Sequence, residues 1–281
     1  MKTNPWMIAG DLVSLPIHAR REEMWLDGFW AHGPTRRKTL LIFLHGMHSN
    51  FYRSRLKKTF LQQSRAYGCD MFTFNNRGAE QQVAHERFED CLEDIEAALT
   101  FGRRQGYRRF VLAGHSTGCQ KIVYYQARRQ NPAVKGLVLL APGDDYAIAR
   151  REAGARFERY VEKARRYVRD GDGDTLMQPR ACLGFSARRY LSIADPTRTE
   201  SKVFNYDGRL HHFRQVRTPT LLLFGSEEEF ACLPVPVMHD RLRAATRSVR
   251  FDDIIVPGAD HGFHGQEEHT ATTALKWMQS V

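Results

Sequence analysis

The sequence lacks several features that would place the protein in a specialised structural class. Its five cysteines are odd in number and scattered, with no CxxC pair, which argues against a disulfide framework or a zinc site. No run approaches the roughly 18 to 20 apolar residues of a membrane-spanning helix, and residues 1–10 do not resemble a secretory signal. We therefore expect no membrane span, a cytoplasmic protein and five buried thiols, namely Cys69, Cys91, Cys119, Cys182 and Cys232.

Signatures of cofactor binding are also missing. The chain contains no G-x-x-x-x-G-K-[ST] phosphate loop, no G-x-G-x-x-G after an expected strand, and no H-E-x-x-H pair. Histidine and cysteine never occur at a spacing suited to zinc. The sequence therefore predicts neither a cofactor nor a metal ion.

Acidic residues are too few to balance the basic ones. The chain has 42 Lys and Arg against 32 Asp and Glu, and residues 146–215 alone hold 15 basic and 9 acidic residues. A basic surface can attract nucleic acid, anionic membranes or acidic substrates. However, Glu152, Glu158 and Glu162 are interspersed among the arginines of residues 150–169. We therefore favour a solvated helix face over an anion-binding one and do not expect nucleic acid as a partner.

Short apolar runs alternate with amphipathic helical patterns along the chain. We expect strands at residues 39–44, 71–74, 109–113, 134–140, 218–224 and 249–256, and helices at 55–67, 88–99, 118–129 and 267–279. This alternation predicts an α/β fold with a doubly wound, mostly parallel sheet. Residues 24–31 alternate around Asp27-Gly28 and predict an antiparallel hairpin at the sheet edge.

The alternation breaks between residues 146 and 215. A long Arg-rich helical pattern over residues 147–169 leads into a turn at residues 170–173 and then a region of weak periodicity. A chain of 281 residues is near the upper size for a single hydrophobic core. We therefore predict one core domain, formed by residues 1–145 and 216–281, with an insertion at residues 146–215. A connection of that length is usually functional.

A serine motif lies at the end of one expected strand. Residues 114–118 read Gly-His-Ser-Thr-Gly and match G-x-S-x-G, directly after the strand at 109–113 and directly before a helix. In that context the serine sits on a tight strand-to-helix turn, and its Oγ points out above the sheet. Glycines flank it because a Cβ at either position would collide with neighbouring backbone. Ser116 is therefore the candidate nucleophile, against the alternative of a structural turn.

A serine hydroxyl needs a histidine base and a carboxylate that orients the base. After the apolar run at 218–224 the chain offers three candidate acids, Glu227, Glu228 and Glu229. His261 lies in a loop between the last expected strand and the C-terminal helix and is the preferred base, with His264 as the alternative. Asp260 is expected to accept loop hydrogen bonds, because an adjacent side chain points poorly at its neighbour's ring.

Taken in order, the serine motif, the acidic loop, the histidine loop and the upstream His45-Gly46 resemble the α/β-hydrolase superfamily, over the whole chain except the insertion. The resemblance implies a triad of Ser116, Glu228 and His261, with the acid three residues after a glycine; Glu227 is the second choice. More narrowly, residues 114–120 and 225–230 resemble the branch that includes fungal siderophore esterases. The chain departs from many lipases at Cys119, where they have a third glycine, and from most members in having Glu rather than Asp as the acid.

The same resemblance implies an oxyanion hole and a cap. In this superfamily the loop after the strand at 39–44 supplies one backbone donor, so we expect the N–H groups of Met47 and Thr117 to stabilise the oxyanion. The insertion at 146–215 stands where the superfamily commonly places a cap over the active site. Its aromatic residues are expected either to pack the cap onto the body or to line a pocket: Phe157, Tyr160, Tyr167, Phe185, Tyr190, Phe204, Tyr206 and Phe213.

The first functional hypothesis is hydrolysis of a small-molecule carboxylic ester through an acyl-enzyme. A second hypothesis is action on another acyl bond, such as a siderophore ester, an amide or a thioester, because these reactions share the triad and differ in the pocket. A third is a non-catalytic binding module with a basic cap. The presence of all three triad residue types in the expected order favours the enzyme.

Overall fold

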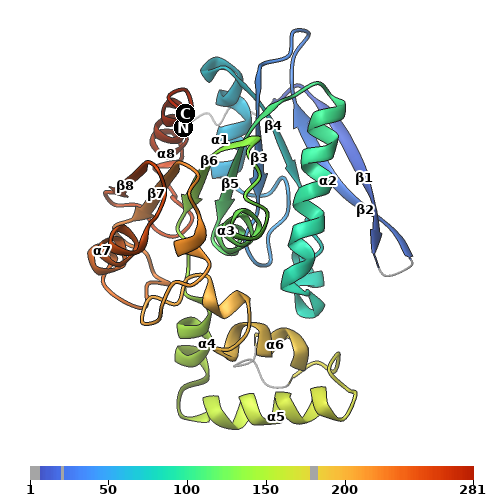
Figure 1. The fold of residues 1–281 in the computed structure, drawn as a ribbon, viewed down its shortest axis with the longest axis vertical. Helices are drawn as coiled ribbons and strands as arrows, with labels where there is room; N and C mark the ends of the chain where they lie inside the picture. Colours follow the sequence, from blue (N-terminus) through green and yellow to red (C-terminus); the bar gives the residue numbers. More distant parts are fainter. Residues whose placement is uncertain (1–6, 20–21, 178–182) are drawn as a thin grey trace.

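The protein is built around one sheet whose strands are not arranged in chain order. The computed structural model describes residues 7–19, 22–177 and 183–281. Within them lies an eight-stranded sheet with the order β1-β2-β4-β3-β5-β6-β7-β8 (Figure 1). The strands are β1 (Asp11–Ala19), β2 (Glu22–Ala31), β3 (Thr39–Leu44), β4 (Cys69–Phe74), β5 (Arg109–His115), β6 (Val134–Leu140), β7 (Thr220–Gly225) and β8 (Phe251–Val256).

The first two strands give the sheet its antiparallel edge. β1 pairs antiparallel with β2, β2 pairs antiparallel with β4, and the remaining neighbours are parallel. β2 runs unbroken through Asp27-Gly28, so the hairpin predicted within residues 24–31 is wrong, although the antiparallel pairing beside the edge is correct. A Cβ on Gly28 would lie 2.6 Å from the carbonyl oxygen of Thr73. This glycine therefore permits close approach of strands rather than a turn.

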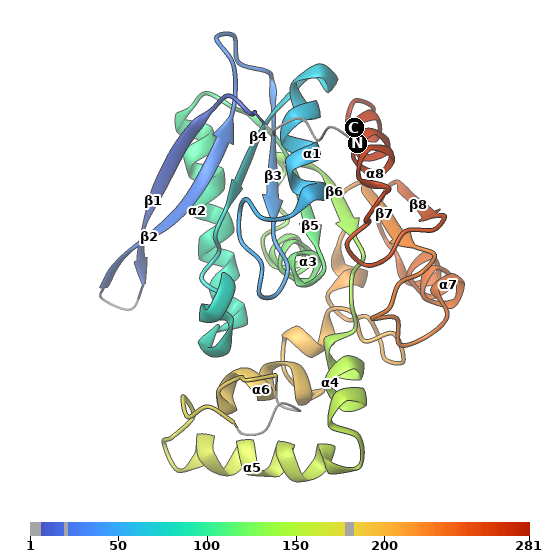
Figure 2. The same ribbon diagram turned by 180° about the vertical axis from the view of Figure 1, so that it is seen from behind.

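Helices cover both faces of the sheet. α1 (Arg55–Gln63) and α8 (Glu267–Met278) pack together on one face, and α2 (Cys91–Arg104) and α3 (Thr117–Arg129) pack together on the other (Figures 1 and 2). α7 (Val235–Ala245) connects β7 to β8. Short 3₁₀ helices occur at η1 (Ser64–Tyr67), η2 (Glu80–His85), η3 (Phe88–Asp90), η4 (Gly154–Arg156), η6 (Glu200–Lys202) and η7 (Phe213–Gln215).

Coverage on both faces explains the continuous apolar runs in the sequence. Every residue of β4 and of β7 is buried, as are all residues of β3 after the first. β8, at the far edge, is mostly half-buried. Parallel strands enclosed by helices have no polar face and so show no alternation. The predicted strands at 39–44 and 134–140 have those bounds in the structure, and the others differ by at most two residues at an end.

A helical segment, residues 145–215, separates β6 from β7 and lies beyond the end of the sheet (Figures 1 and 2). It contains α4 (Asp145–Ala153), α5 (Phe157–Arg169) and α6 (Ala187–Ala194). Their inward residues form a second hydrophobic cluster that is distinct from the core of the sheet. The single Arg-rich helix predicted over residues 147–169 is wrong, because Gly154, at a φ of +55°, ends α4 and a 3₁₀ turn precedes α5.

The arginines of residues 150–169 face solvent, as predicted. On α4, η4 and α5 the arginines are exposed: Arg150, Arg151, Arg156, Arg159, Arg165, Arg166 and Arg169. Most of the segment's aromatic side chains are buried instead, in one or the other of the two hydrophobic clusters: Phe157, Tyr160, Phe185, Tyr190, Phe204, Tyr206 and Phe213. Packing therefore accounts for these aromatics.

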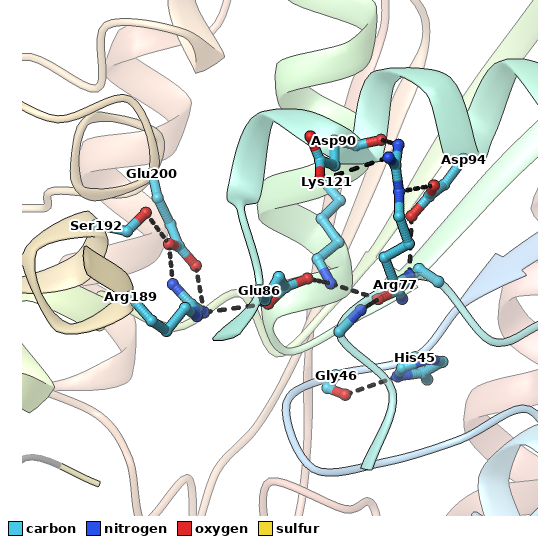
Figure 3. Close-up of polar contacts among 12 residues, drawn as sticks. His45, Gly46, Arg77, Glu86, Asp90, Asp94, Lys121, Arg189, Ser192 and Glu200 are labelled. Carbon is cyan, nitrogen blue, oxygen red and sulfur yellow. Dashed lines mark hydrogen bonds and ion pairs between the residues drawn. The ribbon is translucent and has the colours of Figure 1, made fainter. Parts of the chain in front are cut away.

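A buried ion network connects the helical segment to the sheet's own helices (Figure 3). Arg189 of α6 is fully buried and makes two hydrogen bonds to Glu200 of η6. Its Nη2 also lies 3.3 Å from Oε2 of Glu86, whose Oε1 lies 2.5 Å from Nζ of Lys121 on α3. Lys121 donates a further hydrogen bond of 2.8 Å to Asn76. Each buried charge thus has partners on another element.

The cysteines match the prediction only in part. Cys69, Cys91 and Cys119 are free and buried, whereas Cys232 is free but half-buried, which corrects the expectation of five buried thiols. Cys182 lies outside the described residues. Among the helices in the described ranges, none combines the length and the apolar character that crossing a membrane requires.

Candidate active site

Ser116 occupies a strained turn between β5 and α3. Its φ of 54° and ψ of −126° place it outside the regions that L-residues ordinarily adopt. The turn is fixed on both sides, because the Ser116 N–H donates to the carbonyl of Leu140 at 2.9 Å and the Ser116 carbonyl accepts from the N–H of Cys119 at 2.8 Å. A strained serine directly ahead of a 13-residue helix is the arrangement the motif predicts.

Three glycines make room for this turn. A Cβ on Gly114 would lie 2.4 Å from the carbonyl carbon of Gly118, and a Cβ on Gly118 would lie 2.4 Å from the carbonyl oxygen of Leu44. A Cβ on Gly46 would lie 2.8 Å from the Cβ of Ser116. The glycines of the motif are therefore required by backbone contact, and the loop after β3 passes directly beside the serine.

His261 and Glu228 meet across two loops at the ends of β7 and β8. The Nδ1 of His261 lies 2.7 Å from Oε1 of Glu228, and Oε1 also accepts from the N–H of Phe230 at 3.1 Å. The Glu228 side chain is 2% exposed and that of His261 is 14% exposed. A carboxylate acceptor fixes the ring proton on Nδ1 and leaves Nε2 as the basic nitrogen. The structure thus brings together the preferred acid and the preferred base.

The alternative residues have other partners. The Glu227 carboxylate is exposed and accepts a hydrogen bond of 3.1 Å from Oγ of Ser226. His264 is 69% exposed and contacts Asp260, with 2.7 Å between Nδ1 of the ring and Oδ2. Asp260 also accepts from the backbone N–H of His264, so it acts within its own loop, as expected.

Other residues that hold the histidine were not foreseen from the sequence. Oε2 of Glu229 accepts from the backbone N–H of His261 at 2.8 Å, so the third acid of the loop positions the chain rather than the ring. The ring of Phe230 meets the His261 ring edge-on at 4.8 Å. The neighbouring Gly225 packs so tightly that a Cβ would lie 2.1 Å from the carbonyl oxygen of Ala259. The run of three adjacent acids is the sequence feature from which the contact of Glu229 could have been predicted.

His115, beside the serine, also supports His261. Its Nε2–H donates to the carbonyl of His261 at 2.7 Å. Burial, reinforced by the proximity of His261, lowers the pKa of His115 to about 3. The ring is therefore neutral at ordinary pH and serves as a fixed donor. The variable position x of the G-x-S-x-G pattern gave no hint of this contact.

A buried lysine on α1 anchors the loop that follows β3. Nζ of Lys57, on α1, donates to the carbonyl of Asn50, and the Asn50 side chain accepts from the backbone N–H groups of Tyr52 and Arg53. Burial lowers the pKa of Lys57 to about 7. These contacts fix the loop that carries Met47, and the sequence offered no signal for them.

Four of the five predicted site residues line one pocket of about 250 Å³, and Glu228 is connected to it through His261. Ser116 and His261 line it together with both expected oxyanion donors, Met47 and Thr117. Thr117 is the first residue of α3, where free N–H groups and the helix dipole favour negative charge. The remaining lining residues are His48, Gly143, Asp145, Ile148, Leu183, Ile193 and Phe230. None of the eight aromatic residues that were named as possible pocket lining is among them. Within the described ranges, no group of three or more His, Cys, Asp or Glu is placed to hold a metal ion.

Comparisons with known proteins agree with this architecture. A family model described as the alpha/beta hydrolase family matches residues 41–274. Among solved structures, the siderophore hydrolase EstB from Aspergillus fumigatus superposes with a TM-score of 0.70 at 19% identity, covering 98% of this chain and 97% of that one. No curated protein matches the sequence.

Two further structures extend the likeness. A monoacylglycerol lipase from Paleococcus ferrophilus superposes with a TM-score of 0.67 at 16% identity, covering 92% of this chain and 99% of that one. The carboxylesterase CesB from Bacillus subtilis gives a TM-score of 0.60 at 17% identity, covering 98% and 94%. At identities this low, the superpositions establish the shared fold alone. They confirm the predicted mostly parallel α/β-hydrolase sheet.

Proposed function

The chain belongs to the alpha/beta hydrolase family, and from this premise we propose that it is a serine hydrolase that cleaves carboxylic esters through an acyl-enzyme. The observation that carries the proposal is the convergence of three residues. Ser116 and His261 line one pocket, and His261 is hydrogen-bonded through Nδ1 to Glu228. Ester cleavage in general is also consistent with the esterases and lipases among the structural neighbours.

In the proposed reaction, Oγ of Ser116 attacks the ester carbonyl carbon while Nε2 of His261 takes the hydroxyl proton. The resulting imidazolium is stabilised by Glu228. His261 then returns the proton to the leaving alkoxide, and the C–O bond of the ester breaks to give the acyl-enzyme and the alcohol. In the second half, His261 activates a water molecule, which releases the acid and restores Ser116.

The negative charge of the tetrahedral intermediate needs preorganised donors. We assign this role to the backbone N–H groups of Met47 and Thr117. The support is positional, since both residues line the pocket and the loop that bears Met47 passes beside Ser116 at Gly46. The N-terminus of α3 adds a favourable dipole at the same point.

We further propose that residues 146–215 form a cap on a core domain made of 1–145 and 216–281. Ile148 of α4 and Ile193 of α6 line the pocket, so this segment shapes the space around the reacting group. The pocket walls are largely apolar, which suits the hydrocarbon part of an ester. A small-molecule ester is the substrate class we favour, in keeping with the esterases and lipases among the structural neighbours.

Hydrolysis of p-nitrophenyl esters of graded acyl length by the wild type and by Ser116→Ala, purified in parallel, tests the proposal. Turnover by the wild type alone would support the nucleophile and the reaction class, and the length profile would give the size of the acyl site. Activity retained in Ser116→Ala would contradict the assignment. If both proteins are inactive towards every ester, simple ester hydrolysis is excluded.

A further inference from the structure

The pocket beside Ser116 has one carboxyl group and, among the residues that the structure describes, neither a lysine nor an arginine. Of the described residues that line it, Asp145 is the one acid, and the histidines His48 and His261 are the basic members. This is notable in a chain that carries 42 basic residues and a net charge of +10. The other side chains that line the pocket are mainly apolar, so an ionised carboxylate that faces it is poorly solvated unless a partner is bound.

Asp145 is held in a fixed orientation by the helix of the nucleophile. It is the first residue of α4, and its Oδ2 accepts a hydrogen bond of 2.8 Å from Nε2 of Gln120 on α3. The same Nε2 donates to the carbonyl of Gly143 at 2.9 Å, so Gln120 is itself positioned. Because Gln120 lies in the first turns of the helix that begins after Ser116, Asp145 has a set position relative to the reacting serine.

The buried cations Arg189 and Lys121 are paired with other acids. Arg189 makes two hydrogen bonds to Glu200 and an ion pair with Glu86, and Lys121 pairs with Glu86 as well (Figure 3). Asp145 has no ion pair among the described residues, since its hydrogen-bond partner is the neutral Gln120. The buried cluster behind the pocket therefore has more carboxyl groups than cations.

The charges around Asp145 favour the binding of a cation. Its pKa is raised well above the usual value, first by burial and then by repulsion from Glu200, with a further contribution from Asp144. Arg189 lowers it, but only in part. A positive charge bound in the pocket would relieve both effects, because it would replace lost solvation and balance the neighbouring carboxylates.

We propose that the pocket selects esters that carry a positively charged amine, and that Asp145 is the residue that determines this specificity. The inference rests on the proposed function and narrows its substrate class. Asp145 accepts a charge-assisted hydrogen bond or ion pair from the amine, while the apolar walls contact the carbon chain. The reaction at Ser116 is otherwise unchanged.

Sets of isosteric esters test the proposal. One set comprises methyl 2-aminobutanoate, methyl 2-hydroxybutanoate and methyl 2-methylbutanoate. A second set carries the amino, hydroxyl or methyl group on C3 of the butanoate in place of C2. A third compares the butanoyl ester of choline with 3,3-dimethylbutyl butanoate. Each is assayed with the wild type, Asp145→Asn and Asp240→Asn, at a pH where the amines are charged, and values are divided by the uncatalysed hydrolysis rate. Asp240 is exposed on α7 and serves as the matched control.

The wild type should show a kcat/KM at least about tenfold higher for the cationic member of one or more sets than for its methyl isostere. Asp145→Asn keeps the size of the side chain, so it should abolish that preference, measured as the ratio of kcat/KM for the cationic member to kcat/KM for the methyl member. Asp240→Asn should behave like the wild type. A wild type that prefers the methyl or the hydroxyl member in every set would overturn the proposal, as would an Asp145→Asn variant that keeps the preference for the amine.

Two further outcomes distinguish failure of the proposed specificity from failure of the proposed function. If the wild type hydrolyses the methyl members and its kcat/KM is no higher for the amines, the proposed specificity is wrong and the proposed ester hydrolysis is supported. If it hydrolyses no ester and a fluorophosphonate does not label Ser116, both are wrong. Should Asp145→Asn fail to fold, the specificity is tested on the wild type by comparing the competitive inhibition constants of butylammonium and 1-butanol. Stronger inhibition by the cation supports the proposal, and equal inhibition contradicts it.

Discussion

Oε1 of Glu228 lies 2.7 Å from Nδ1 of His261, while the carboxylates on either side of Glu228 in the sequence have different partners. Glu227 contacts Ser226, and Glu229 accepts from the backbone N–H of His261. Of three consecutive acids, one thus contacts a neighbouring serine, one contacts the imidazole ring of His261 and one accepts from the His261 backbone. This division makes the acid of the proposed triad testable with closely matched variants.

Glu228→Gln should lower kcat on a p-nitrophenyl ester by about 10²- to 10⁴-fold, because the neutral amide no longer stabilises the imidazolium or fixes its tautomer. Glu227→Gln should change kcat by less than about twofold, since its side chain is exposed and does not contact the ring. Steady-state kinetics on both variants decide the assignment. A greater loss in Glu227→Gln would transfer the role to that residue.

The strain at Ser116 predicts a gain in stability when the serine is removed. With φ at 54° and ψ at −126°, glycine adopts the backbone conformation more easily than a residue with a Cβ. Ser116→Gly should therefore unfold with a free energy about 1 kcal/mol higher than Ser116→Ala. Denaturant titration of the two inactive variants measures the difference, and equal stability would show that the turn is not strained.

Gly114 should not tolerate a methyl group. In Gly114→Ala the new Cβ would lie 2.4 Å from backbone atoms of Gly118, so the turn around Ser116 must move. We expect destabilisation by more than about 3 kcal/mol together with loss of activity. Gly143→Ala is the control, because its nearest neighbour would be 3.4 Å away, in the flexible side chain of Ile148. Comparable thermal unfolding of the two variants would refute the steric account.

Arg189 should contribute strongly to stability through the charges it neutralises. Arg189→Met leaves Glu200 and Glu86 buried with their shared guanidinium partner removed, which should cost about 3 to 5 kcal/mol. Arg188→Met is the matched neighbour, since Arg188 is 40% exposed and its partner Asp174 is 64% exposed. That change should cost less than about 0.5 kcal/mol. Urea unfolding of both variants gives the comparison, and similar costs would mean that the buried network is dispensable.

His115 should make the protein sensitive to acid. Its folded pKa of about 3 lies below its ordinary value of 6.5, so below pH 6.5 the unfolded chain takes up a proton that the folded chain does not. The stability that neutral His115 contributes is fully present above pH 6.5 and is lost as the pH falls towards 3. In His115→Gln the stability deficit relative to wild type should therefore shrink between neutral and acid pH. A constant difference across this range would contradict the shifted pKa.

The sequence was most informative where one physical requirement fixes the residue type. The glycines at 114 and 118 are needed because backbone atoms lie about where a Cβ would be, so the motif in its strand-to-helix context predicted the turn. Likewise, the continuous apolar runs of β3 and β6 located those strands, since burial on both faces permits little else.

The sequence was least informative where a residue type has several possible causes. Gly28 suggested a turn but permits close packing between β2 and β4. Strand β1 was missed because Pro16 interrupts its pattern, which an edge strand tolerates. The contacts of Glu229 and His115 with the His261 backbone join residues that are 32 and 146 positions apart in the sequence, and no local pattern encodes such contacts.

The most direct test of the account is labelling of the folded protein with a fluorophosphonate, followed by peptide mass spectrometry. The account predicts stoichiometric modification of Ser116, no labelling of Ser116→Ala, and much slower labelling of His261→Ala and Glu228→Gln. Modification at another residue, or equal labelling of the wild type and Ser116→Ala, would contradict the claim that Ser116 is the nucleophile.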